Sequence, residues 1–209
     1  MSNGIKVVKR NGSIESIDLE KMHKMVEQAC EGLAQVSASQ VEINSGIQFF
    51  DGITTAQIQE ILIRSASDLI DLDHPNYQFV ASRLLLFSLR KGLYGRLRDM
   101  PHLRDQINSG VEKGIYDKDI LNKYTDEEIE KVNSFIDHDR DFLFTYAALR
   151  QVVDKYLVQD RSSGKVFEVP QFMYILIAMT IFAEYPPENR LDYVKRYYDA
   201  ISKHRINIP

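Results

Sequence analysis

Cysteine is nearly absent from this chain of 209 residues, which contains one, Cys30, and no tryptophan. One thiol cannot form an internal disulfide, and the sequence has no CxxC pair to hold zinc. These absences favour a reducing compartment, so we expect a cytoplasmic protein. We expect Cys30 itself to be a small buried hydrophobic residue and not a catalytic group.

Long apolar runs and a strong excess of one charge are also absent. The longest apolar stretches, such as residues 84–87 and 172–183, are shorter than the roughly 20 residues of a membrane span. The N-terminus lacks the apolar segment of a signal peptide. The formal net charge is −4, which is not typical of a nucleic-acid-binding protein. We therefore expect neither a membrane nor a nucleic acid as a partner.

The first element that the sequence predicts is a β-hairpin. Two strand-like runs flank Asn11-Gly12, which favours a two-residue type I′ turn because that turn needs positive φ twice. In this register Arg10 faces Ser13. Arg10 then lies on the same face of the hairpin as Glu15, and the neighbouring Lys9 lies on the other face.

Four helices are predicted after the hairpin. Asp18 is a typical N-cap for the first, and Thr54 with Gln57 forms a capping box at the start of the third. The fourth begins after His74-Pro75 and ends near Gly95. The expected fold class is therefore mainly α with a small amount of β, in which a β-hairpin caps a four-helix domain.

A second domain is expected after residue 95. The apolar pattern thins over residues 96–106, so we predict two domains, 1–95 and 96–209. The second is predicted to be helical, with a small hairpin around residues 161–165. A helix beginning at Pro170 is apolar nearly all round, and we expect it to be buried.

The charged hairpin is the strongest candidate for a binding site. A nucleoside triphosphate brings about four negative charges and needs several cations, backbone donors and an apolar slot for its base. The hairpin supplies Lys9 and Arg10, the first helix supplies Lys21, and the end of the fourth helix supplies Lys91.

Other residues near these cations have suitable chemistry. Val7 and Ile17 can hold a flat ring, and Glu15 and Asp18 can accept from a ribose hydroxyl or a base amine. Thr55 offers a hydroxyl at a positive helix terminus. Taken alone, these residues are better explained as a solvated charge cluster, because most such clusters are uncommitted.

Asp137-His138-Asp139 is a weak candidate for a metal site. Three consecutive residues of a helix point in different directions and rarely close on one ion. We expect these residues to act at a helix start, and we predict no catalytic residue and no metal ligand.

Longer stretches of the sequence carry a resemblance to a known family. The segments VVKRNGSIESIDLEKM, DGITTAQIQ and YQFVASRLLLFSLRKGLYG resemble the ATP-cone domain. The continuation, from KGIYDKDILNKY to YYDAISKHRINIP, resembles the N-terminal helical region of the large (α) subunit of class Ia ribonucleotide reductase, in its bacterial and bacteriophage form.

The resemblance implies an allosteric role in making deoxyribonucleotides for DNA synthesis. In that family the ATP cone is the overall activity site, where ATP turns the enzyme on and dATP turns it off. ATP or dATP is then the expected ligand, with Mg²⁺ on the triphosphate. The residues implied as nucleotide contacts are Val7, Lys9, Arg10, Glu15, Ser16, Ile17, Asp18, Leu19, Glu20, Lys21, Thr55, Gln59, Phe87 and Lys91.

Two positions depart from the family pattern. Many relatives have His where this chain has Gln59, near the triphosphate, so the affinity or the ATP/dATP balance is expected to differ. Some relatives have Trp where this chain has Gln28, and that ring helps a second nucleotide bind. The departure at Gln28 argues against a second nucleotide.

The family's catalytic cysteines lie in an α/β barrel that would follow Pro209. The resemblance therefore implies that this chain alone is inactive as an enzyme. The implied partners are the remainder of the large subunit, either in the same chain or in a separate one, the small radical-generating subunit, and further copies of this chain. The setting is the cytoplasm of a bacterium or of a phage-infected host.

Two other functions remain to be weighed. ATP cones also occur in a repressor of reductase genes, but that repressor carries a four-cysteine zinc ribbon, and one cysteine argues against it. A helical interaction module whose cone no longer binds nucleotide stays open as an alternative.

Overall fold

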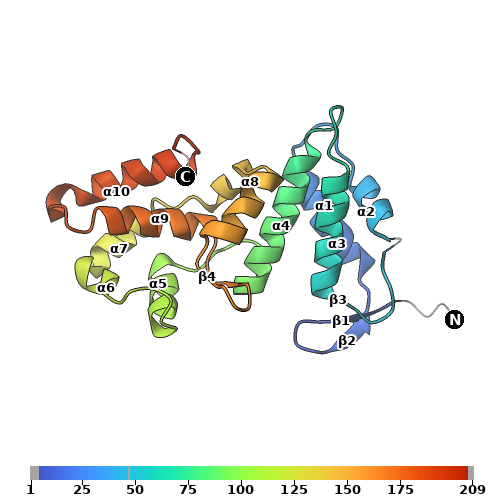
Figure 1. Cartoon of the computed structure of the whole chain (residues 1–209), viewed down its shortest axis with the longest axis horizontal. Coiled ribbons are helices and arrows are strands. Elements are labelled where there is room, and N and C mark those ends of the chain that lie inside the picture. Colours follow the sequence, from blue (N-terminus) through green and yellow to red (C-terminus); the bar gives the residue numbers. More distant parts are fainter. Residues whose placement is uncertain (1–4, 47, 207–209) are drawn as a thin grey trace. The chain divides into compact units, whose positions relative to one another are not determined.

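The computed structural model describes residues 5–46 and 48–206. By its internal contacts the chain forms two compact units, Met1–Leu89 with Phe144–Arg150, and Arg90–Leu143 with Gln151–Pro209. Helices dominate both units and strands are few and short (Figure 1), which confirms the predicted fold class. Within the described part of the chain, no helix has the length and apolar character needed to cross a membrane.

The first unit has a three-stranded sheet at one end of its helices (Figure 1). The strands β1 (Lys6–Val8) and β2 (Ile14–Ser16) are antiparallel, and β3 (Ile53–Thr54) pairs in parallel with β1. The sequence predicted the hairpin but not β3. Two residues give too little alternation to indicate a strand, although Val7 and Ile53 pair within the buried core.

Four helices follow in this unit, as predicted. The Asp18 carboxylate accepts from the Lys21 backbone N–H at 2.9 Å at the start of α1, and the predicted Thr54–Gln57 capping box begins α3. The fourth helix, α4, runs past the end of the first unit at Leu89. The bounds are α1 (Leu19–Cys30), α2 (Ala38–Gly46), α3 (Thr55–Asp68) and α4 (Tyr77–Tyr94), and α8 (Tyr146–Gln151) adds a short helix.

The second unit is built around α9 (Pro170–Ile181), which is buried along most of its length as predicted. The helix α10 (Pro187–Ser202) runs alongside it (Figure 1). The predicted second hairpin is present as β4 (Gln159–Asp160) and β5 (Lys165–Val166). The remaining elements are α5 (Leu103–Glu112), α6 (Ile120–Lys123), α7 (Asp126–Asn133), the 3₁₀ helix η1 (His138–Leu143) and the π-helical turn η2 (Val152–Tyr156).

Candidate nucleotide site

The turn of the first hairpin differs from the prediction. It is a three-residue loop, in which the Lys9 N–H donates to the Ser13 carbonyl at 2.8 Å and the Gly12 N–H donates to the Lys9 carbonyl at 2.9 Å. Gly12 has φ +83°, and Asn11 is not among the described non-glycine residues with positive φ. A type I′ turn needs both residues there, so the predicted turn was wrong, and the geometry is that of a type I turn followed by a left-handed glycine.

The longer loop shifts the register by one residue and exchanges the partners of the two hairpin cations. Val7 is opposite Glu15, so Lys9 and Glu15 lie on the same face, and the Lys9 Nζ is 3.2 Å from the Glu15 carboxylate. The prediction that Arg10 shares a face with Glu15, and that Lys9 lies on the other face, was therefore wrong. The guanidinium of Arg10 donates instead to the Gln59 Oε1 of α3 at 3.0 Å.

Gln59 lies at the centre of a small polar cluster. Its Oε1 also accepts from the Ser88 hydroxyl of α4 at 3.0 Å, and its Nε2 is 3.9 Å from the Met25 Sδ of α1. The Gln59 side chain is buried, with 7% exposure, although Arg10 is exposed. The cluster thus joins the hairpin to three helices. Sequence reasoning singled out Gln59 and Arg10 but missed Ser88, which no motif marks.

The start of α1 carries most of the remaining predicted residues. Residues 15–21 are exposed except for Ile17, which is half-buried. Ser16 accepts from the Lys6 Nζ at 3.1 Å, and Glu20 accepts from the Lys24 Nζ at 2.7 Å. Because β2 leads directly into α1, the predicted residues Ser16, Ile17, Asp18, Leu19, Glu20 and Lys21 form one continuous segment after the hairpin.

The start of α3 lies beside the same strands. Val8 pairs with Thr54, so the first turn of α3 follows directly from the sheet. The capping box uses Thr54 and Gln57. The hydroxyl of Thr55, a half-buried residue, takes no part in that box and lies at the positive end of the helix.

The predicted apolar contacts divide into two groups. Val7 is 2% exposed and Phe87 is 4% exposed, so both belong to the hydrophobic core of the unit. Ile17 is half-buried, and Leu19 is 57% exposed. Among the predicted contacts, Ile17 and Leu19 are therefore the ones that offer apolar surface to a ligand.

Lys91 is the predicted cation that belongs to the second unit. It lies in the last turn of α4, three residues after Ser88, and the division between the units falls between Leu89 and Arg90. Its part in a nucleotide site stays a prediction.

Comparison with known proteins assigns the two parts of the chain. Residues 5–92 match the ATP cone domain, and residues 142–209 match the ribonucleotide reductase all-alpha domain. The chain therefore combines a region similar to ATP cone domains with a region similar to the ribonucleotide reductase all-alpha domain. The residues matched to the ATP cone include the hairpin, α1 to α3, most of α4 and every predicted nucleotide contact.

Curated large subunits are similar over essentially the whole chain. Ribonucleoside-diphosphate reductase 1 subunit alpha of Escherichia coli (strain K12) is 50% identical over 209 residues, and the subunit alpha of Haemophilus influenzae is 47% identical over 209 residues. The subunit alpha of Enterobacteria phage T4 is 39% identical over 207 residues. The alignments cover 100%, 100% and 98% of this chain, which spans only 27%, 28% and 27% of these relatives.

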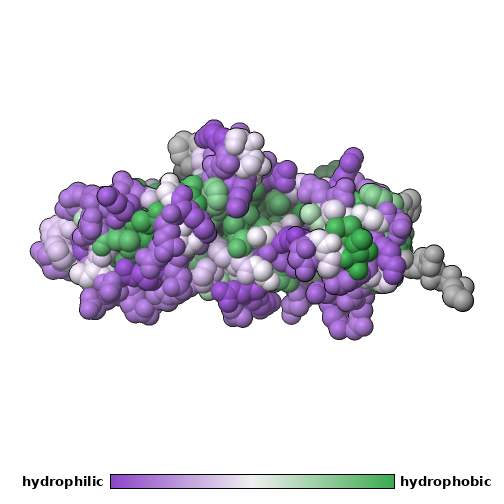
Figure 2. All heavy atoms as spheres, turned by 90° about the horizontal axis from the view of Figure 1, so that it is seen from below, coloured by the Kyte–Doolittle hydropathy of each residue, from purple (hydrophilic) through white to green (hydrophobic). Residues whose placement is uncertain are grey.

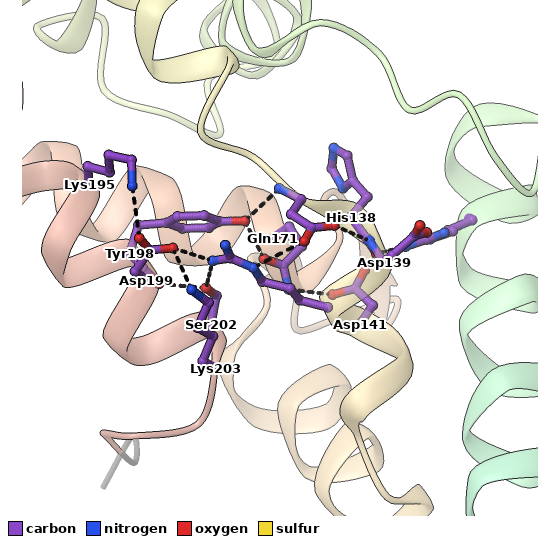
Figure 3. Close-up of polar contacts among 12 residues, drawn as sticks. His138, Asp139, Asp141, Gln171, Lys195, Tyr198, Asp199, Ser202 and Lys203 are labelled. Carbon is purple, nitrogen blue, oxygen red and sulfur yellow. Dashed lines mark hydrogen bonds and ion pairs between the residues drawn. The ribbon is translucent and has the colours of Figure 1, made fainter.

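Buried polar groups of the second unit form a different kind of cluster, in which Asp141, Gln171 and Tyr198 lie close together (Figure 3). The Arg90 Nη2 is 2.9 Å from the Asp141 Oδ2, and these two side chains are 2% and 0% exposed. Gln171 donates to the other oxygen of Asp141 at 2.9 Å and accepts from the Tyr198 hydroxyl at 2.7 Å. Burial raises the pKa of Asp141, and the Arg90 guanidinium opposes this rise. These groups bond to one another, which suits a structural role.

His138, the candidate for a metal site, packs against this cluster. Its ring meets the Phe172 ring edge-on at 4.9 Å, and its backbone carbonyl accepts from Arg90 at 2.6 Å. Burial, with the nearby Arg90 charge, lowers the pKa of His138 to about 4. Within the ranges that the structure describes, no group of three His, Cys, Asp or Glu residues could hold a metal ion.

Cys30, at the end of α1, is partly buried. Burial raises the pKa of its thiol to about 11. A thiol with such a pKa is a poor nucleophile at neutral pH.

The second unit also contains a hollow of about 410 Å³ that the sequence did not indicate. The Tyr116 hydroxyl donates to the Glu168 carboxylate in its wall at 2.6 Å. No Lys or Arg is among the described residues that line it, so its chemistry does not suit a triphosphate. The aliphatic residues of the hollow include Ile115, Ile120, Val158, Leu176, Ile177 and Ile181.

Hydrophobic residues also reach the surface of the molecule, in patches on the face drawn in Figure 2.

Proposed function

We propose that this chain is the nucleotide-sensing part of a ribonucleoside-diphosphate reductase large subunit, with ATP as the activating and dATP as the inhibiting effector. The observation that carries the proposal is the strand arrangement of the ATP cone. Because β2 leads into α1 and β3 leads into α3, the hairpin cations share one end of the cone with two helix N-termini. Cations beside helix N-termini suit a triphosphate.

The roles follow from the chemistry of the side chains. Lys9, Arg10, Lys21 and Lys91 neutralise the phosphates, with Mg²⁺ supplying further positive charge. The Thr55 hydroxyl adds a donor at the N-terminus of α3.

We expect the segment that joins β2 to α1 to bind the base and the ribose. Ile17 and Leu19 offer apolar surface to the base, and Glu15 and Asp18 accept from the ribose or the base. A carboxylate accepts several hydrogen bonds, so Asp18 can do this while it caps α1.

ATP and dATP differ by one 2′-hydroxyl, so discrimination between them depends on how the site binds this group. A site that hydrogen-bonds a hydroxyl rejects its absence sharply, whereas a site that only tolerates it does not. The two nucleotides therefore shift a population between arrangements of the cone, with a coupling of about 1–3 kcal/mol. Gln59 is a neutral amide where many relatives have His, so this balance is expected to be specific to this chain.

The remainder of the enzyme lies outside this sequence. Since the chain spans about 27% of its relatives' length, we infer that the catalytic cysteines belong to the remaining part and that this chain alone reduces no ribonucleotide. Its partners are then the rest of the large subunit, the small radical-generating subunit and further copies of itself.

Titration calorimetry with ATP and dATP tests the proposal. We expect both nucleotides to bind, at one nucleotide per chain because Gln28 replaces the Trp that helps a second one bind in some relatives. Lys91→Glu should weaken both at least tenfold, because it replaces a phosphate partner by a repelling charge, and should abolish dATP inhibition in the complete enzyme.

The control is Lys113→Glu, which makes the same charge change on an exposed residue that lies outside the predicted site. If wild-type protein binds neither nucleotide, the sensing function is wrong and the chain is an interaction module. If Lys91→Glu binds as wild type does, Lys91 is not part of the site.

A further inference from the structure

We propose that Gln59 and Ser88 are positioning residues, which hold the Arg10 guanidinium ready for a triphosphate, and that Gln59 itself does not contact the nucleotide. This inference rests on the proposed nucleotide-binding function. It assigns Gln59 a role different from that of a direct contact, and it adds Ser88 to the site.

The first observation is that two donors converge on one oxygen atom. The Gln59 Oε1 accepts from the Arg10 Nη2 at 3.0 Å and from the Ser88 hydroxyl at 3.0 Å. An amide oxygen has two lone pairs, so these two hydrogen bonds use its full accepting capacity.

The orientation of the Gln59 amide is fixed by its partner. Arginine has no acceptor, so the oxygen of the amide must face Arg10 and its nitrogen must face the other way. The Nε2 accordingly lies 3.9 Å from the Met25 Sδ. Because Gln59 is only 7% exposed, we infer that neither polar atom of its amide is directed at a ligand.

The second observation concerns Arg10, which is exposed on the hairpin loop. An arginine that is ordered only when its ligand binds loses rotamer freedom at that moment. The contact with Gln59 restricts the side chain beforehand. It engages one of the five N–H donors of the guanidinium, and phosphate oxygens can accept from others.

The neutral partner matters for the charge of Arg10. Lys9, on the same hairpin, lies 3.2 Å from the Glu15 carboxylate, which compensates part of its charge. An amide orients a guanidinium without compensating its charge. Arg10 is therefore oriented by a contact that leaves its charge uncompensated, which a carboxylate at position 59 would not allow.

The test is a double-mutant cycle measured by calorimetry with ATP. Gln59→Met keeps the size of the side chain and removes the acceptor, and we expect the Kd to rise about three- to tenfold, the cost of ordering one long side chain on binding. In an Arg10→Ala background the same change should have no further effect, because the residue that Gln59 positions is gone. Ser88→Ala should give a smaller rise that is lost in the same background.

Lys9→Ala provides the matched background, because Lys9 pairs with Glu15 and not with Gln59. There Gln59→Met should raise the Kd as much as it does in wild-type protein. The salt dependence of the Kd gives a second readout. Gln59→Met keeps every charge and should leave this dependence unchanged, whereas Arg10→Ala should reduce it. Circular dichroism and the unfolding midpoint show whether each variant is folded.

The outcomes separate this proposal from the function on which it rests. Absence of ATP and dATP binding to wild-type protein overturns both. If wild-type protein binds and Gln59→Met binds equally well, the positioning role alone is overturned. An equal loss from Gln59→Met in the wild-type and Arg10→Ala backgrounds means that Gln59 contacts the nucleotide directly, which also overturns the positioning role.

Discussion

One ion pair from each unit shows opposite surroundings. In the ATP cone, Lys9 is 30% and Glu15 is 57% exposed on the hairpin. In the second unit, Arg90 and Asp141 are buried and pair with each other. Arg90 also donates to the backbone carbonyl of His138, and Asp141 accepts from the Gln171 side chain. Exposed pairs contribute little to folding stability, whereas breaking a buried pair is costly. The comparison indicates that the Arg90–Asp141 pair maintains the fold and that the charges of the hairpin are available for a ligand.

The largest expected effect is on stability and follows from removing Asp141. Asp141→Ala leaves the buried Arg90 guanidinium without its carboxylate, so we expect the free energy of unfolding to fall by about 3–5 kcal/mol. Urea unfolding followed by circular dichroism measures this. Arg90→Met combined with Asp141→Leu should recover part of the loss, because both charges are then removed. A loss below about 1 kcal/mol in Asp141→Ala would show that this pair is no more important than a surface pair.

The next largest expected effect concerns the exposed charges of the hairpin. Lys9→Ala should change the free energy of unfolding by less than about 1 kcal/mol but should raise the Kd for ATP about tenfold or more, because a charged hydrogen-bond donor is lost. Urea unfolding and calorimetry on the same preparation measure the two quantities. Lys113→Ala should change neither. A Lys9 variant that is strongly destabilised and binds ATP normally would reverse the assignment of the hairpin charges.

The smallest expected effect is a difference between the pKa values of two histidines, His23 and His138. His23 of α1 lies 2.8 Å from Glu42 and 3.2 Å from Glu27, and the hydrogen bond with Glu42 raises its pKa above 6.5. Its stabilising contribution is therefore complete below pH 6.5 and is lost as the pH rises through the raised pKa. NMR titration should place the pKa of His23 above 6.5 and that of His138 near 4.

The contribution of His138 to the pH dependence of stability has the opposite sign. Because its pKa is lowered in the folded state, the unfolded chain binds more protons between the two values, and stability is lost as the pH falls from 6.5 toward 4. His138→Gln should remove that loss, and Glu42→Gln should bring the pKa of His23 back toward its ordinary value. Equal pKa values for the two histidines would contradict the difference in their surroundings.

Local signals in the sequence predicted much of the fold. Asp18 and the Thr54–Gln57 capping box mark the starts of α1 and α3, because a cap depends on residues three positions apart. The apolar content of α9 predicted its burial. The helix α5 was missed because its apolar residues are sparse and Pro101 precedes it, and β3 was missed because two residues carry no period.

The candidate site was predictable in its residues but not in its contacts. The charge and the spacing of Lys9 and Arg10 indicated a binding surface, yet the loop length was wrong by one residue. In a hairpin, such an error moves every side chain to the other face. The partner of Arg10 is 49 positions away in the sequence, and the partner of Arg90 is 51 positions away. Only the folded chain brings such residues together.

The most direct test of nucleotide sensing by the ATP cone is hydrogen–deuterium exchange of the whole chain with and without saturating ATP and Mg²⁺. We predict protection in residues 6–21 and 54–59, with little change in residues 115–120 and 156–181 around the hollow of the second unit. Protection confined to the second unit, or no protection anywhere, would contradict nucleotide binding at the hairpin.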